Sequence, residues 1–348
     1  MPILWCLTYP GGSLFFTFSF LFSLLDSLMP YLLNLLRRSR RLFWVLIKIM
    51  LPVMALVQAG QWLGWIDAIG HTIAPAMALL DLPPEAGMIW VAGVCVGVYG
   101  AIGALIGLAP QLDLNVAQLS ALCAMVLFAH GLPVEQAIVR RAGASFWATA
   151  ALRLGAAVLY AAAVAWACRW GGWLQQPVSL GWLQSSALAA DAQGSGVLDW
   201  LRGTAMSLLF TYGVIVALLV LLDIFERTGL TRAITAMLMP LLRVSGLDAR
   251  VAPVTTVGVL LGLSYGGALI IEEADKNQLP ARTRFLALAW ISLSHSLIED
   301  TALLLTLGAD IWIILVGRVA LTLAVVALLA RLIKGGGPAD ARLSPAAG

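Results

Sequence analysis

Two short stretches decide the fold: HGLPVE at residues 130–135 and HSLIED at residues 295–300. Both lie in apolar segments, and together they hold two of the chain's three histidines. An ungapped self-alignment at an offset of 165, which takes residue 130 to residue 295, superimposes these histidines and several other residues. The other matches are Gly64/Gly229, Pro75/Pro240, Gly93/Gly258, Gly97/Gly262, Leu132/Leu297, Gly143/Gly308, Ala144/Ala309, Trp147/Trp312 and Arg153/Arg318. Unrelated sequence gives about one Gly/Gly match over roughly 120 positions, so the pattern predicts an internal duplication.

Composition indicates an all-α, polytopic membrane protein, because 61% of the residues are hydrophobic, 11% are charged and the mean hydropathy is +0.93. The net charge of +3 is small and the arginines form short runs, which suit membrane topology rather than a nucleic-acid partner. The four cysteines are far apart and form no C-x-x-C, so no disulfide framework or zinc-cysteine site is expected. Nucleotide-binding and hydrolase motifs are missing. We therefore expect no enzyme, no catalytic residues and no cofactor.

The chain divides into five parts. An apolar preface with a basic cluster occupies residues 1–42, and the two repeats occupy residues 43–169 and 205–334. A Gly-, Gln- and Ser-rich linker (170–204) joins them, and residues 335–348 read as a disordered tail. The preface has no counterpart in the second repeat, so a native start at Met29 is an alternative to Met1.

Each repeat is expected to contain about three spans, an amphipathic helix and a re-entrant or broken helical hairpin. In the first repeat we expect spans at Phe43–Ala59, Ala86–Leu108 and Ala144–Cys168, an amphipathic helix at 61–81, and the hairpin at 117–141. The second repeat is expected to follow the same order: a span at 205–225, an amphipathic stretch to 250, a span at 251–271, a polar loop at 272–284, a broken segment at 285–307 and a last span at 309–333.

Basic residues indicate that the two repeats have opposite orientations. The amphipathic stretch 61–81 carries no Lys or Arg, whereas its counterpart 227–250 carries four arginines. Three spans and one re-entrant hairpin per repeat allow most basic clusters to face the cytoplasm. Arg169, Arg202 and a loop with Lys276, Arg282 and Arg284 are then left outside.

Three stretches resemble a known family: "GLSYGGALIIEEADK", "SHSLIEDT…LGADIW" and "AHGLPVEQAIVRRAG". They are similar to the bacterial nucleoside recognition, or Gate-domain, membrane proteins. These are relatives of the gate regions of the ferrous-iron transporter B family, the concentrative nucleoside transporters and the spore maturation proteins. The resemblance covers about residues 40–335 and implies a multi-pass protein of the bacterial inner membrane with gate-like hairpins. The chain lacks the GTPase P-loop of the iron transporters, and the family label does not imply nucleosides as substrates.

The candidate binding residues are the polar groups of the duplicated stretches. They are His130, Glu135, His295, Glu299, Asp300, Arg153 and Arg318. Each histidine can act as a proton relay or a metal ligand, and His295 and Glu299 have the i, i+4 spacing of one helix face. The carboxylates can carry a proton or a cation, and the arginines can bind an anionic group or neutralise the carboxylates. Buried polar pairs that only stabilise a hairpin tip are the structural alternative.

Inverted repeats with broken helices are typical of secondary transporters, whose sites lie near the membrane midplane at the repeat interface. We therefore expect a carrier for a small solute or ion, embedded in lipid, with a possible homo-oligomeric state. A non-transporting membrane scaffold that binds a partner is the alternative.

Overall fold

The structure is a computed structural model that describes residues 12–178, 197–248, 251–277 and 279–333. The described residues form helices and no strand, as expected for an all-α membrane protein. Within these described residues, five helical segments are long and apolar enough to cross a membrane: Met29–Trp62, Val116–Arg141, Phe146–Gly171, Trp200–Arg227 and Trp312–Leu332. The predicted tail, residues 335–348, and most of the linker lie outside the described residues.

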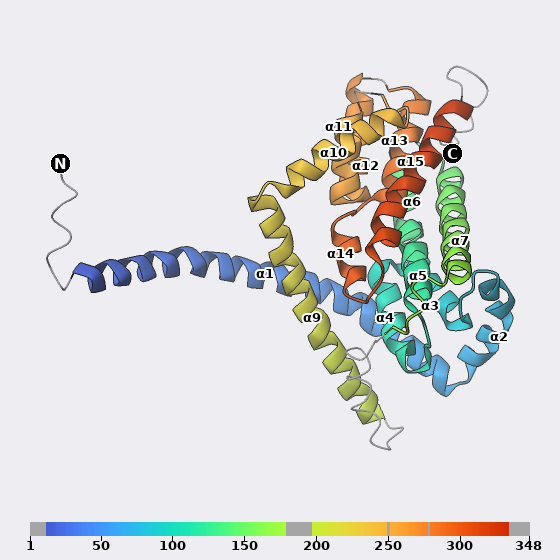
Figure 1. The fold of residues 1–348 in the computed structure, drawn as a ribbon, viewed down its shortest axis with the longest axis horizontal. Coiled ribbons are helices and arrows are strands. Elements are labelled where there is room, and N and C mark those ends of the chain that lie inside the picture. The colour runs from blue at the N-terminus through green and yellow to red at the C-terminus, as the bar shows by residue number, and fades with distance from the viewer. Residues whose placement is uncertain (1–11, 179–196, 249–250, 278, 334–348) are drawn as a thin grey trace.

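The helices follow the same order in both halves (Figure 1). The first half contains α1 (Gly12–Trp62), α2 (Trp65–Ala78), α3 (Pro84–Val96), α4 (Val98–Leu108), α5 (Val116–Phe128), α6 (Leu132–Arg141) and α7 (Phe146–Gly171). The second contains α9 (Val197–Arg227), α10 (Leu230–Val244), α11 (Ala252–Leu261), α12 (Leu263–Asn277), α13 (Ala281–Ser294), α14 (Glu299–Leu305) and α15 (Arg318–Leu332). A π-helical segment, Trp312–Gly317, leads into α15.

The offset that aligns the sequence also aligns the places where the backbone turns. Ten of the twelve described residues with positive φ occur in pairs 165 positions apart: Gly64/Gly229, Asp81/Gly246, Gly97/Gly262, Gly131/Ser296 and Gly143/Gly308. These residues break or end helices, since a left-handed residue cannot continue a right-handed helix. An internal duplication predicts that such turns recur at a constant offset.

The predicted continuous span over Ala86–Leu108 is wrong. Gly97, with φ 119° and ψ −178°, ends α3 and starts α4, and the two helices pack against each other as a hairpin. Their 13 and 11 residues extend only about 16–20 Å at 1.5 Å per residue, too short for a hydrocarbon core of about 30 Å. Gly262 breaks the predicted span at 251–271 in the same way, and α11 packs on α12 there.

The helical hairpin of each half therefore precedes the position at which the sequence suggested a re-entrant hairpin. Helices α5 and α6, which follow each other in Figure 1, form one apolar segment, Val116–Arg141, that is long enough to cross a membrane. The helix is interrupted between Phe128 and Leu132, around His130. In this segment 72% of the most apolar window is buried, against 33% or less in the other four candidate spans. The broken span is thus the centre of the molecule, and the other spans lie at its periphery.

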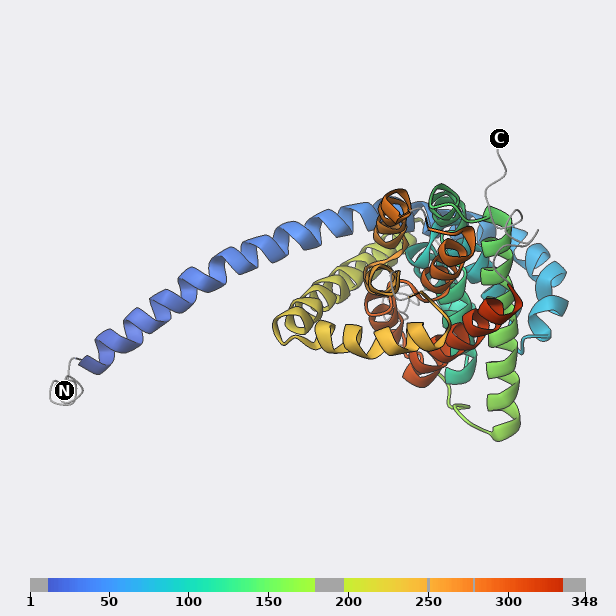
Figure 2. The same ribbon diagram turned by 90° about the horizontal axis from the view of Figure 1, so that it is seen from above.

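Helix α1 joins the described part of the predicted preface to the first predicted span in one helix, and its N-terminal part projects away from the other helices (Figures 1 and 2).

The polar loop predicted at 272–284 begins later than expected, because α12 continues to Asn277.

The structure also changes the side of the membrane expected for the basic loop that holds Arg282 and Arg284, which the sequence left on the outer side. Arg282 donates to the carbonyls of Ala330 (2.5 Å) and Ile333 (2.7 Å) at the end of α15, and the guanidinium of Arg284 lies against Gly143 at the end of α6. This loop is therefore at the same end of the molecule as Arg140, Arg141 and Arg331. The correction removes one exception to the positive-inside rule.

Candidate functional site

The candidate site lies where two helical segments are interrupted, one in each half of the chain. Helix α5 ends before His130, and Gly131 then takes a left-handed conformation (φ 56°) before α6 begins. Helix α13 ends before His295, and Ser296 takes a similar conformation (φ 50°) before α14 begins. Both breaks leave helix-end carbonyls without intrahelical partners, which costs free energy in an apolar interior unless other groups donate to them.

Arg153 supplies those donors in the first half. Its side chain is completely buried, and it donates from Nε to the Phe128 carbonyl (2.7 Å) and from Nη2 to the His130 carbonyl (2.9 Å). Its Nη1 forms an ion pair with Glu135 Oε2. Since the end of a helix carries partial negative charge, a guanidinium there is stabilised by the carbonyls as well as by the carboxylate.

Arg318 holds the equivalent position in the second half and is also completely buried. It donates from Nε to the Leu293 carbonyl (2.9 Å) and from Nη2 to the His295 carbonyl (3.1 Å). Nη2 also contacts the Leu127 carbonyl (3.1 Å) at the end of α5. This arginine therefore joins the two breaks to each other.

The two histidine rings meet between the breaks. Nδ1 of His130 lies 2.8 Å from the Val126 carbonyl, and Nδ1 of His295 lies 3.0 Å from the Ile291 carbonyl. A carbonyl oxygen only accepts hydrogen bonds, so each Nδ1 carries a proton and each Nε2 of a neutral ring presents a lone pair. The two Nε2 atoms are 3.0 Å apart, and both residues are at least 95% buried.

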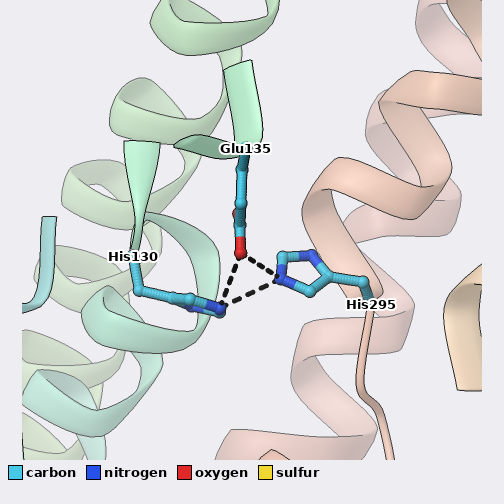
Figure 3. A group of neighbouring side chains, drawn as sticks. All are labelled: His130, Glu135 and His295. Carbon is cyan, nitrogen blue, oxygen red and sulfur yellow. Dashed lines mark hydrogen bonds and ion pairs between the residues drawn. The ribbon is translucent and has the colours of Figure 1, made fainter. Parts of the chain in front are cut away.

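Glu135 completes this cluster, as Figure 3 shows. Its Oε1 lies 3.2 Å from Nε2 of His295 and 3.4 Å from Nε2 of His130. The other carboxylate oxygen faces Arg153, which fixes the orientation of the group. Residues from both halves of the chain thus converge on one point, which we call the His–Glu cluster (His130, Glu135 and His295).

Asp300 occupies the position that corresponds to Glu135 in the second half. Its Oδ2 lies 3.8 Å from Nε2 of His130 and is a buried oxygen without a hydrogen-bond partner among the described residues. Nη1 of Arg318 likewise has no hydrogen-bond partner within the described part of the chain. The second half therefore repeats the arginine and the acid without joining them in an ion pair.

Glu299 lies apart from the cluster, and the expectation that it shares a helix face with His295 is wrong. The break falls between them, because His295 is extended (φ −73°, ψ 163°) and α14 begins only at Glu299. Tyr99 donates a long hydrogen bond (3.5 Å) to Glu299 from the start of α4. Sequence reasoning missed Tyr99, although the matched glycine two residues before it marks this turn.

The His–Glu cluster needs a positive charge at its centre. Two imidazole lone pairs and a carboxylate oxygen repel one another at these distances unless a proton or a metal ion lies between them. Of the three candidate carboxylates only that of Glu135 pairs with a guanidinium among the described residues, whereas Asp300 lies 3.8 Å from His130 and Glu299 accepts from Tyr99. The candidate residues therefore suit a cation better than an anion.

Comparisons with known proteins agree with the membrane assignment. No protein-family model matches the chain, and no solved structure matches it significantly. The chain is similar to the uncharacterized membrane protein YvoD of Bacillus subtilis, with 24% identity over 276 residues, which cover 79% of this chain and 86% of the relative. The similarity, the apolar helices and the all-α fold together identify a polytopic membrane protein.

Proposed function

We propose that this protein is a carrier that moves a small solute or ion across the bacterial cytoplasmic membrane, with its binding site between the two halves of the chain. The proposal includes neither an enzymatic reaction nor a resident cofactor. It rests mainly on one observation: polar residues from two equivalent helix breaks meet in the buried His–Glu cluster.

Two features of the structure and one of the sequence support a carrier. Broken helices inside a membrane protein are tolerated where they are buried in protein or line a polar cavity, and transporters use such breaks to bind substrates. Each half has a short hairpin, α3–α4 or α11–α12, beside its break. The sequence resemblance to Gate-domain proteins agrees with this arrangement, and it also supports the bacterial inner membrane as the location.

The first test is a thermal-shift screen of the purified protein against nucleosides, divalent metal ions and organic anions. A ligand that binds the native state raises its apparent stability, by about 2.7 kcal/mol at a concentration 100 times Kd. Uptake of the ligand into proteoliposomes then measures transport.

We expect His130→Ala and His295→Ala each to abolish uptake, and the double variant to add little, because both residues belong to one cluster. Normal uptake by the double variant would show that the histidines are structural. A protein that binds its ligand but transports nothing would instead be a binding module or scaffold.

A further inference from the structure

We infer that the His–Glu cluster is a binding site for one divalent transition-metal ion, of the Zn²⁺, Fe²⁺ or Mn²⁺ class. Binding of the ion is argued from the cluster itself, whereas its identity as the cargo rests on the proposed function. His130 and His295 would each bind through Nε2, and Glu135 would bind through Oε1.

The spacing of the three atoms fits a metal ion without rearrangement. Their separations of 3.0, 3.2 and 3.4 Å define a triangle whose centre is about 1.9 Å from each corner. Zinc bonds to imidazole nitrogen and carboxylate oxygen are about 2.0–2.2 Å long. An ion slightly less than 1 Å above the plane of the triangle would therefore reach all three atoms at normal bond lengths.

The groups around the three ligand atoms are those that metal sites commonly have. Histidine ligands usually donate the other ring N–H to a carbonyl or carboxylate, and both Nδ1 atoms here contact the backbone carbonyls of Val126 and Ile291. Arg153 holds the second oxygen of Glu135, which leaves Oε1 directed at the histidines. These contacts fix the tautomers and orientations before any ion arrives.

A buried carboxylate oxygen offers a fourth ligand. Asp300 Oδ2 is 3.8 Å from Nε2 of His130, has no hydrogen-bond partner among the described residues, and belongs to a residue that is 93% buried. An unpaired buried oxygen of this kind is costly unless something binds it. Two imidazoles with one or two carboxylates favour transition metals over Ca²⁺ and Mg²⁺, which prefer all-oxygen sites.

The experiment measures metal binding to the full chain after removal of its affinity tag. Isothermal titration of the EDTA-stripped protein with Zn²⁺ should give one site per chain, and Co²⁺ should give visible absorption bands that report its ligand geometry. We expect His130→Gln, His295→Gln and Glu135→Gln each to weaken Zn²⁺ binding by more than tenfold, since loss of an outer-shell contact alone typically costs 10–100-fold. The control is His71→Ala, which removes the remaining histidine and should bind Zn²⁺ like the parent.

Circular dichroism and gel filtration without metal establish that each variant is folded, and the conservative Gln replacements limit damage to the core. Failure of the folded parent to bind Zn²⁺ or Co²⁺, or equal binding by the parent and the three Gln variants, would overturn the metal site and leave a proton as the shared charge. Zn²⁺ binding without uptake of Zn²⁺ into proteoliposomes would support the metal site and contradict the metal ion as the cargo. Uptake of another solute by a protein that binds no metal would support the carrier and contradict the metal site.

Discussion

The two helix breaks share their backbone design and differ in one ion pair. In the first half, Arg153 contacts the carbonyls at the end of α5 and also pairs with Glu135. In the second half, Arg318 contacts the carbonyls at the end of α13, but its Nη1 and Asp300 Oδ2 both lack hydrogen-bond partners among the described residues. The contacts that the two arginines share are their hydrogen bonds to the carbonyls of the interrupted helices. The ion pair with the acid is an additional contact, present among the described residues in the first half alone.

The length of the acid explains the difference. Glu135 is one methylene longer than Asp300, so its carboxylate reaches Arg153 with one oxygen and the histidines with the other. Asp300 cannot extend as far from its backbone position. In the proposed metal site, the first half would thus provide a ligand of fixed orientation, and the second half a carboxylate oxygen without a hydrogen-bond partner among the described residues.

The comparison depends on the two halves having opposite orientations in the membrane. Cysteine labelling from outside the cell tests this and should give the largest of the expected effects. Leu63 and Thr228 are equivalent exposed residues at the turns before Gly64 and Gly229. Single cysteines at these positions in a cysteine-free background should differ completely in labelling by an impermeant thiol reagent added to intact cells. Residue 63 should react and residue 228 should be protected. Equal labelling of both would instead indicate parallel copies.

The ion pair of the first half, which the described part of the second half lacks, should affect the stability of the protein. Arg153→Ala leaves a buried carboxylate unpaired and should lower the free energy of unfolding by about 3–5 kcal/mol. Glu135→Gln should restore only the part of that loss that comes from the ion pair, about 2 kcal/mol of coupling in a double-mutant cycle, because the carbonyls of Phe128 and His130 still lack their donor. The cycle for Arg318→Ala and Asp300→Asn should give less than about 0.5 kcal/mol, because the two side chains form no ion pair.

Reversible unfolding in mixed micelles, followed by tryptophan fluorescence with EDTA present, measures both cycles in the metal-free protein. Glu135→Asp is the matched control, since it gives the first half the shorter acid of the second. It should reduce the coupling to Arg153. Equal coupling energies in the two halves would contradict the asymmetry described above.

The smallest expected effect concerns the left-handed residues of the two breaks. Ser296 (φ 50°) holds the place that Gly131 (φ 56°) holds in the first half. A residue with a side chain costs about 1–2 kcal/mol in this conformation, and part of the gain from glycine is lost to chain entropy. Ser296→Gly should therefore stabilise the protein by about 0.5–1 kcal/mol, whereas Gly131→Ser should destabilise it by about 1 kcal/mol.

The same unfolding assay checks the pair of substitutions. Opposite signs for the two changes are the expected result. Destabilisation by Ser296→Gly would mean that the serine side chain makes a contribution larger than the backbone strain.

The sequence by itself determined the fold class, and it named as candidates six residues that the structure brings to the two breaks; what these residues bind stays a prediction. Composition decides membrane insertion because apolar helices are stable in lipid, and matched glycines mark turns because left-handed conformations favour residues without a side chain. His130, Glu135, His295, Asp300, Arg153 and Arg318 were therefore visible as candidates before any coordinates.

Tertiary structure alone decided which of these residues meet and which helices fold back. Local spacing suggested that His295 and Glu299 share one helix face, but the break at Ser296 separates them. The carboxylate that His295 contacts is that of Glu135, 160 residues away in the sequence. The sequence also placed the hairpins one segment too late, because a glycine inside an apolar run can serve helix packing or end a helix. Gly97 and Gly262 end their helices only because the helices that follow them have a surface to pack on, and that surface is built from distant parts of the chain.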